Sequence, residues 1–208
     1  MSEYFVPAGS GEAEFVEKRS SFLSHVRFAG TEDAAREFIN EMKKKHYDAR
    51  HNCWCYIIRE GAVRYSDDGE PQGTAGLPML EVFRREGVEN VVCVVTRYFG
   101  GVLLGTGGLL RAYTKSAKDA LDAAGIAAVR RWVKLETACP YSLLERMKTE
   151  CLALDGVVSD VEYGADVRMS FLLPEEKAEE FQARVTELSA GQSSAKAVGE
   201  ELMPVRVR

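Results

Sequence analysis

The chain has 208 residues, of which 46% are hydrophobic and 28% are charged, and its formal net charge is −5. This is the composition of an ordinary globular protein and excludes wholesale disorder. The sequence contains no run of about 18 apolar residues, so it predicts no membrane-spanning helix and no membrane partner.

The charges are divided unevenly along the chain. Residues 1–135 carry 19 Lys/Arg and 18 Asp/Glu, whereas residues 136–208 carry 8 and 14. Because an acidic surface repels nucleic acid, any nucleic-acid contact is expected in the first part. The N-terminus lacks a signal-peptide pattern, and five scattered cysteines do not indicate a disulfide framework. A cytoplasmic location with reduced thiols is therefore expected.

The first part of the chain alternates between predicted strands and helices. Thr31, followed by two acidic residues, is a good helix start, and the lysines at 43–45 suit a helix end. In chain order we expect two extended runs within 12–28, a helix at 31–45, strands at 53–59 and 62–66, a helix at 77–85, a buried strand at 91–96 and a helix at 109–124. Two polar or glycine-rich loops lie between these elements, at 66–76 and 97–108.

The second part predicts the order strand, helix, strand, strand, helix, strand. The strands are expected at 132–139, 157–163, 167–173 and 197–207, and the helices at 141–154 and 175–189. This order matches the split βαβ plan of a ferredoxin-like domain. The predicted fold class is therefore α+β with two domains, residues 1–127 and 128–208.

The loop at 97–108 is the strongest candidate for ligand binding. It follows a buried strand and precedes a helix, which directs free backbone N–H groups and a helix dipole at one point, as an anion requires. The candidate anion-binding residues are Gly100, Gly101, Gly107 and Gly108 with Arg97, Arg111 and Lys115. The alternative is that the glycines serve only tight turns and close helix packing.

Arg50 and His51 lie just before the predicted strand at 53–59, beside Tyr47 and Trp54. Positive charge with aromatic rings is the combination by which proteins bind single-stranded RNA, through backbone attraction and base stacking. The alternative is that Trp54 packs within the sheet as an ordinary large aromatic residue.

The loop at 66–76 contains an acidic group formed by Asp67, Asp68, Gly69 and Glu70. Carboxylates this close can hold Mg²⁺, but Asp side chains also accept backbone N–H bonds in turns and at helix starts. We favour capping because the loop offers no further ligands, and we predict no metal and no cofactor. No catalytic residue is assigned, because the sequence does not bring a base next to a chosen nucleophile.

Three sequence blocks resemble the signature blocks of the YigZ/IMPACT family in content, spacing and order. They are ARHNCWCY (Ala49–Tyr56), SDDGEPQGTAGLPML (Ser66–Leu80) and VTRYFGGVLLGTGGLLRAY (Val95–Tyr113). The resemblance covers residues 12–124, and the acidic second part is similar to the extra C-terminal domain of bacterial YigZ proteins.

The resemblance implies a first domain like domain 2 of ribosomal protein S five and a ferredoxin-like second domain like the last domain of elongation factor G. Eukaryotic IMPACT members regulate translation under stress by binding an activator of an initiation-factor kinase. Bacteria lack that pathway, so this partner does not carry over, and the family supplies no catalytic residues to transfer.

Three functions are compatible with these observations. The first is a non-enzymatic regulator that binds RNA, the ribosome or translation factors through the first domain. The second is a protein–protein adaptor that binds a regulatory protein without nucleic-acid contact. The third is an enzyme acting on a small phosphorylated substrate held between the acidic loop and the glycine-rich loop. Since fold alone does not determine activity, the choice depends on the site.

Overall fold

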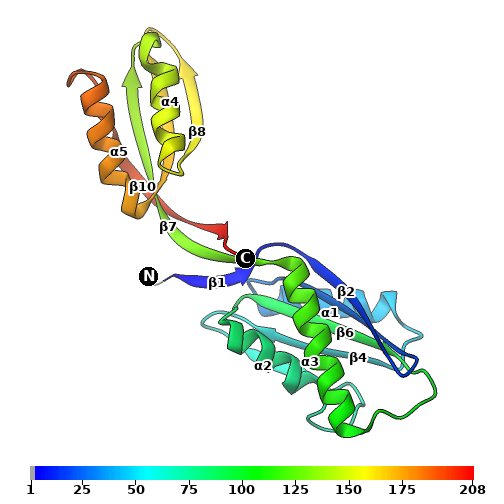
Figure 1. Cartoon of the computed structure of the whole chain (residues 1–208). Coiled ribbons are helices and arrows are strands. Elements are labelled where there is room, and N and C mark those ends of the chain that lie inside the picture. Colours follow the sequence, from blue (N-terminus) through cyan, green and yellow to red (C-terminus); the bar gives the residue numbers. More distant parts are fainter. Residues whose placement is uncertain (1–2) are drawn as a thin grey trace. The chain divides into compact units, whose positions relative to one another are not determined.

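A computed structural model describes residues 3–208 and divides the chain into two compact units (Figure 1). The first unit contains Tyr4–Val129 and Pro204–Arg208, and the second contains Arg130–Met203 together with Glu3. Helices and mainly antiparallel sheets are combined in both units, which is the predicted two-domain α+β class. Residues 204–208, which the sequence assigns to the second domain, group with the first unit.

The first unit is built on an antiparallel sheet with the strand order β2-β3-β6-β4-β5. Its strands are β2 (Gly11–Glu17), β3 (Ser20–Phe28), β4 (His51–Ile57), β5 (Val63–Ser66) and β6 (Val91–Tyr98). Its helices are α1 (Glu32–Lys45), α2 (Gly76–Glu86) and α3 (Gly105–Ala124). The central strand β6 is almost entirely buried, because α2 and α3 cover one face of the sheet and α1 the other. Its continuous apolar run follows from burial on both faces.

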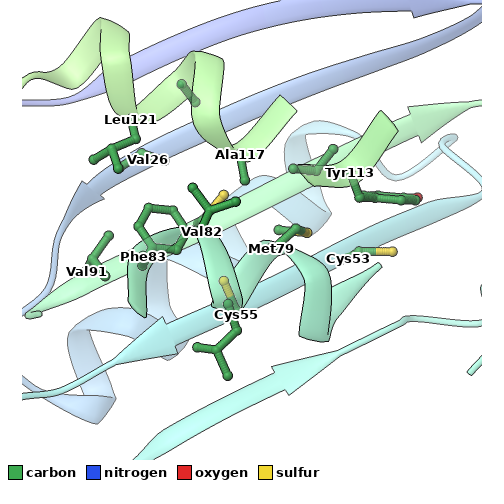
Figure 2. Packing of buried hydrophobic residues seen from close by; sticks show 14 of the residues in the cluster. Val26, Cys53, Cys55, Met79, Val82, Phe83, Val91, Tyr113, Ala117 and Leu121 are labelled. Carbon is green, nitrogen blue, oxygen red and sulfur yellow. The ribbon is translucent and has the colours of Figure 1, made fainter. Parts of the chain in front are cut away.

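Strand β4 shows how the sequence divides the two layers of this core. Cys53 and Cys55 point toward α2 and α3, whereas Tyr56 and the half-buried Trp54 point toward α1, because successive side chains alternate across a strand. In Figure 2, Phe83 of α2 and Tyr113 of α3 pack over the sheet on the Cys53 side. Each large apolar side chain buried in this way contributes about 1.5–3 kcal/mol.

The second unit has the strand order β10-β7-β9-β8, which is the ferredoxin-like arrangement. Its elements are β7 (Ile126–Cys139), a single 3-10 turn (Tyr141–Leu143), α4 (Leu144–Ala153), β8 (Val157–Tyr163), β9 (Val167–Pro174), α5 (Glu175–Leu188) and β10 (Lys196–Arg206). Both helices bury side chains against β9: Met147 of α4 and Phe181 of α5 lie in one core with Phe171. The Phe171 and Phe181 rings meet edge to face with centroids 4.9 Å apart.

Both ends of the chain attach to the start of β7, within the first unit. Strand β1 (Tyr4–Pro7), which the sequence analysis did not predict, pairs antiparallel with Ile126–Val129. The Ile126 N–H donates to the Arg208 carbonyl at 2.9 Å, and the Val207 N–H donates to the Ile126 carbonyl at 2.8 Å. Arg208 also forms an ion pair of 2.9 Å with Glu86. Within residues 3–208, no helix is long and apolar enough to cross a membrane.

Helix α3 begins at Gly105, four residues before the predicted start at 109. Glycine is a poor helix former, so the sequence pattern predicts a loop there. The first turn of a helix is tolerant, however, because its N–H groups have no acceptor within the helix. Gly105 has a φ of +71°, and the chain enters the helix through this left-handed residue. Gly107 and Gly108 are therefore helical rather than part of a loop.

Two buried histidines of the first unit, His25 and His46, lie with ring centroids 5.8 Å apart. Burial lowers the pKa of both, and the Lys45 ammonium lowers each of them further. The folded state therefore holds these rings neutral, whereas the unfolded chain protonates them as the pH falls through about 6.5. The stability that the neutral rings provide is present above that pH and is lost below it.

We expect the free energy of unfolding, measured with denaturant, to fall between about pH 7.5 and about pH 5. Each histidine contributes a slope of at most about 1.4 kcal/mol per pH unit. The double variant His25→Gln/His46→Gln should show a shallower decline. An equally steep decline in that variant would assign the pH dependence to other groups.

Candidate functional site

The two predicted loops meet around one cavity of about 340 Å³ in the first unit. The acidic loop contributes one wall, and the segment between β6 and α3 contributes the other. The lining residues are Arg50, His51, Gly69, Glu70, Pro71, Arg97, Phe99, Leu103, Leu104, Gly105, Thr106 and Leu109. The cavity thus gathers several predicted site residues that lie far apart in the sequence.

The floor of the cavity contains a buried ion pair between Arg97 and Glu70. Arg97 Nη1 donates to Glu70 Oε1 at 2.7 Å, and both side chains are almost fully buried. The Tyr113 hydroxyl donates to the same oxygen at 2.9 Å. Burial, with neighbouring Cys53 and Glu70, raises the pKa of Tyr113, so its hydroxyl stays protonated as a donor. Arg97 is therefore neutralised within the protein, where the sequence suggested a free anion-binding cation.

His51 is held in one orientation at the side of this pair. Its Nδ1 lies 2.8 Å from the Asp68 carbonyl oxygen. Because a carbonyl can only accept, Nδ1 carries the hydrogen, and in the neutral ring Nε2 is left as an acceptor. This Nε2 lies 4.0 Å from Glu70 Oε1. An imidazole acceptor and a carboxylate acceptor are thus adjacent at the cavity floor.

Asp67 and Asp68 shape the acidic loop rather than point together at one centre. Asp67 accepts backbone N–H bonds from Gly73, Ala75 and Gly76 at 2.8–3.0 Å, which caps the start of α2. Asp68 accepts from the Asn52 N–H at 2.7 Å and pairs with Lys43 at 2.8 Å. No group of three His, Cys, Asp or Glu side chains suited to a metal ion occurs in the described part of the chain.

The N-terminus of α3 lies at the other wall of the cavity. Gly105 and Thr106 line the cavity, and no side chain caps this end of the helix. The Arg111 side chain reaches back over Gly107, with Nη1 3.7 Å from the position a Cβ would take there. Free N–H groups and an exposed guanidinium are thus combined at the first turn of the helix.

The mouth of the cavity combines exposed arginine with apolar side chains. The Arg50 guanidinium carbon lies 5.7 Å from the centre of the Phe99 ring, and the Arg97 carbon lies 5.5 Å from it. Phe99 is 39% exposed and Leu103 is 83% exposed. Neither residue was predicted as part of the site, although Phe99, an aromatic residue directly before Gly100 in the glycine-rich segment, was a usable signal.

Three of the predicted residues, Lys115, Gly100 and Gly101, lie outside the cavity lining. Lys115 lies more than two turns along α3, pairs with Asp119 at 2.7 Å and does not line the cavity. Gly100 lies against the β2–β3 turn, where its N–H donates to the Ser20 hydroxyl at 3.2 Å. Gly101 has a φ of +84° and no neighbouring atom within 4 Å of a Cβ position, so it serves the turn. The remaining glycines and arginines belong to the cavity or to the adjacent helix end.

Comparison with known proteins places both parts of the chain. Residues 18–121 match the family model of the Impact N-terminal domain, and residues 137–192 match that of a domain of unknown function, DUF1949. A solved structure described as that of a hypothetical protein is similar with a TM-score of 0.60 and 32% identity, over 96% of this chain and 98% of that chain.

Two curated bacterial relatives are similar over nearly their whole length. The IMPACT family member YvyE of Bacillus subtilis is 37% identical over 94% of this chain and 91% of its own. The IMPACT family member YigZ of Escherichia coli is 32% identical over 96% of this chain and 100% of its own. With both models matched in order along the chain, the protein belongs to the IMPACT family.

Proposed function

We propose that the first unit binds single-stranded RNA at the mouth of the cavity, and that the protein acts through this contact as a non-enzymatic cytoplasmic regulator of translation. The observation that carries the proposal is the exposed Phe99 ring beside the Arg50 guanidinium at the mouth of a lined cavity. An exposed ring offers a stacking surface to a base, and the arginine attracts the adjoining phosphate. The five cysteines, all free thiols, support a reducing compartment.

Phosphate contacts are proposed for Arg50, Arg111 and the N-terminus of α3. Both arginines are exposed and have no ion-pair partner among the described residues. Arg97 is left out of this set, because its charge is compensated by Glu70. In nucleic-acid binding, phosphate contacts usually position the protein on the strand, and base contacts select the sequence.

The proposal is tested by fluorescence anisotropy of a labelled single-stranded RNA over a salt series. The double variant Arg50→Ala/Arg111→Ala should lose most of the affinity. Its salt slope should fall by about 1.4, since each phosphate contact on a single strand contributes about 0.7. These two arginines are preferable to Arg97, whose removal would disturb the folded core.

A matched control removes the same charge from the second unit. Arg146 and Arg168 are both exposed, and the variant Arg146→Ala/Arg168→Ala should bind RNA like the wild type. An equal loss of RNA affinity in both double variants would show that net charge, rather than Arg50 and Arg111 in particular, accounts for the binding. Flat anisotropy with folded wild-type protein would contradict RNA binding.

A protein adaptor is the second candidate, because Val102 and Leu103 are 42% and 83% exposed at the tip of the same segment. Exposed apolar side chains in a cluster are typical of protein-binding surfaces. In this case the immobilised wild-type protein should capture a specific protein from a lysate that has been treated with nuclease. The variant Val102→Ser, at a residue outside the cavity lining, should lose that protein.

A further inference from the structure

We propose that the cavity beside Phe99 receives a guanine base, so that the RNA bound by the protein is selected for guanine. The inference deepens the proposed RNA binding and rests on it. It follows from the chemistry of the cavity floor, which offers hydrogen-bond acceptors next to donors rather than the uniform positive charge that a phosphate requires.

The floor of the cavity disfavours a phosphate. Glu70 is 3% exposed in its side chain, and its carboxylate lies directly against the Arg97 guanidinium. A phosphate approaching Arg97 would meet this carboxylate at close range in a poorly solvated place, where like charges repel strongly. Phosphates therefore belong outside, near Arg50 and Arg111, and a neutral group belongs inside.

Glu70 and Arg97 together present the pattern complementary to the edge of guanine. A guanidinium has five N–H donors. Arg97 uses one on Glu70 at 2.7 Å and a weak one on Ser20 at 3.4 Å, while its buried Nε has no partner. Glu70 Oε1 already accepts from Arg97 and Tyr113, so the acceptor left for a base is the second carboxylate oxygen, Oε2, with its two lone pairs. Guanine carries two adjacent donors, the ring N1–H and the 2-amino group, next to the O6 acceptor.

His51 supplies a second acceptor at the correct place. Its Nδ1–H is occupied by the Asp68 carbonyl, which leaves Nε2 as an acceptor 4.0 Å from Glu70 Oε1. The 2-amino group of guanine has two hydrogens, and these two neighbouring acceptors can take one each. Adenine and cytosine lack a second donor beside the amino group, and uracil has a single ring N–H.

The walls and the size of the cavity suit one base. Phe99, Leu103, Leu104 and Leu109 provide apolar surface for the faces of a flat ring. A volume of about 340 Å³ is at the small end of ligand pockets, which admits a base but not a run of nucleotides. The backbone on either side of the inserted base would then lie along the mouth, beside Arg50.

The test is fluorescence anisotropy of the full chain with labelled uridine oligonucleotides that carry one central guanosine, inosine, adenosine or cytidine. The guanosine oligonucleotide should bind about 5- to 150-fold more tightly than the adenosine or cytidine one, which is the usual range for a bidentate base contact. Inosine lacks the 2-amino group but keeps N1–H and O6, so it should lie between.

The variant His51→Leu removes the second acceptor, which glutamine would replace with its amide oxygen. It should reduce the preference for guanosine over inosine while leaving the smaller preference for inosine over adenosine. The ratio of the guanosine and inosine affinities does not change when the variant binds all oligonucleotides more weakly by the same factor. Equal binding of all four oligonucleotides would overturn the guanine inference and leave RNA binding intact. No binding by any of them, from folded protein, would remove both proposals.

Discussion

Replacing Arg97 with alanine will lower the free energy of unfolding by about 3–5 kcal/mol. The variant leaves the Glu70 carboxylate buried with the Tyr113 hydroxyl as its remaining short hydrogen bond, since His51 Nε2 is 4.0 Å away. An unpaired charge in the interior has lost its water and gained no compensation, which is why the cost exceeds that of an ordinary hydrogen bond. Denaturant titration followed by circular dichroism measures the change.

Two comparisons show whether loss of the Arg97–Glu70 ion pair causes the fall in stability. Arg111→Ala removes an equal charge from an exposed position of α3 and should change stability by less than about 0.5 kcal/mol. The double variant Arg97→Met/Glu70→Met removes both charges and should be more stable than Arg97→Ala, because no charge is left alone in the core. A loss below about 1 kcal/mol for Arg97→Ala would show that Glu70 does not depend on this partner.

Gly100→Ala will destabilise the first unit by about 1–3 kcal/mol or more, because the new Cβ has no free space. It would stand 2.0 Å from the carbonyl carbon of Arg19 and 2.4 Å from the backbone nitrogen of Ser20. Both are backbone atoms of the β2–β3 turn, so the turn and the segment before α3 must separate. The hydrogen bond from the Gly100 N–H to the Ser20 hydroxyl is lost as they do.

Gly107→Ala is the matched control and should have the opposite sign. A Cβ at Gly107 meets only Arg111 Nη1, at an ordinary 3.7 Å, and alanine is up to about 1 kcal/mol more favourable than glycine in a helix. Thermal unfolding of the two variants side by side gives the comparison. An unchanged melting temperature for Gly100→Ala would contradict this expectation and show that the β2–β3 turn moves aside without loss of stability.

Much of the fold was predictable from local patterns, because periodicity and capping are local. Thr31 caps α1 through the Ala34 N–H at 3.2 Å, as the predicted helix start requires. The strand predicted at 53–59 is present as β4, His51–Ile57. Strand β1 was missed because four residues carry too little pattern, and its pairing with Ile126–Val129 is a contact of long sequence separation. Such pairings are decided by tertiary structure.

The candidate site was less predictable, because its parts are joined by contacts that no spacing reveals. The signature blocks contain His51, Glu70 and Arg97, and the structure brings these three residues together at one cavity. Their chemistry was not evident: Arg97 looked like a free cation until its burial beside Glu70 was known. Tyr113 lies on the buried face of α3, and helical periodicity does not reveal that its hydroxyl reaches Glu70. Charge compensation is a property of the folded interior.

The return of residues 204–208 to the first unit makes the second unit an insertion within the chain of its neighbour. The polypeptide leaves the first unit after Val129 and returns to it at Pro204. The returning segment is bound to the start of β7 through the backbone hydrogen bonds of Ile126 with Val207 and Arg208. A cut at residue 127 alone would therefore deprive the host of the Val207 and Arg208 backbone bonds. Joining Val129 directly to Pro204 would retain these bonds. Such a spliced chain represents the first unit more completely than a simple truncation does.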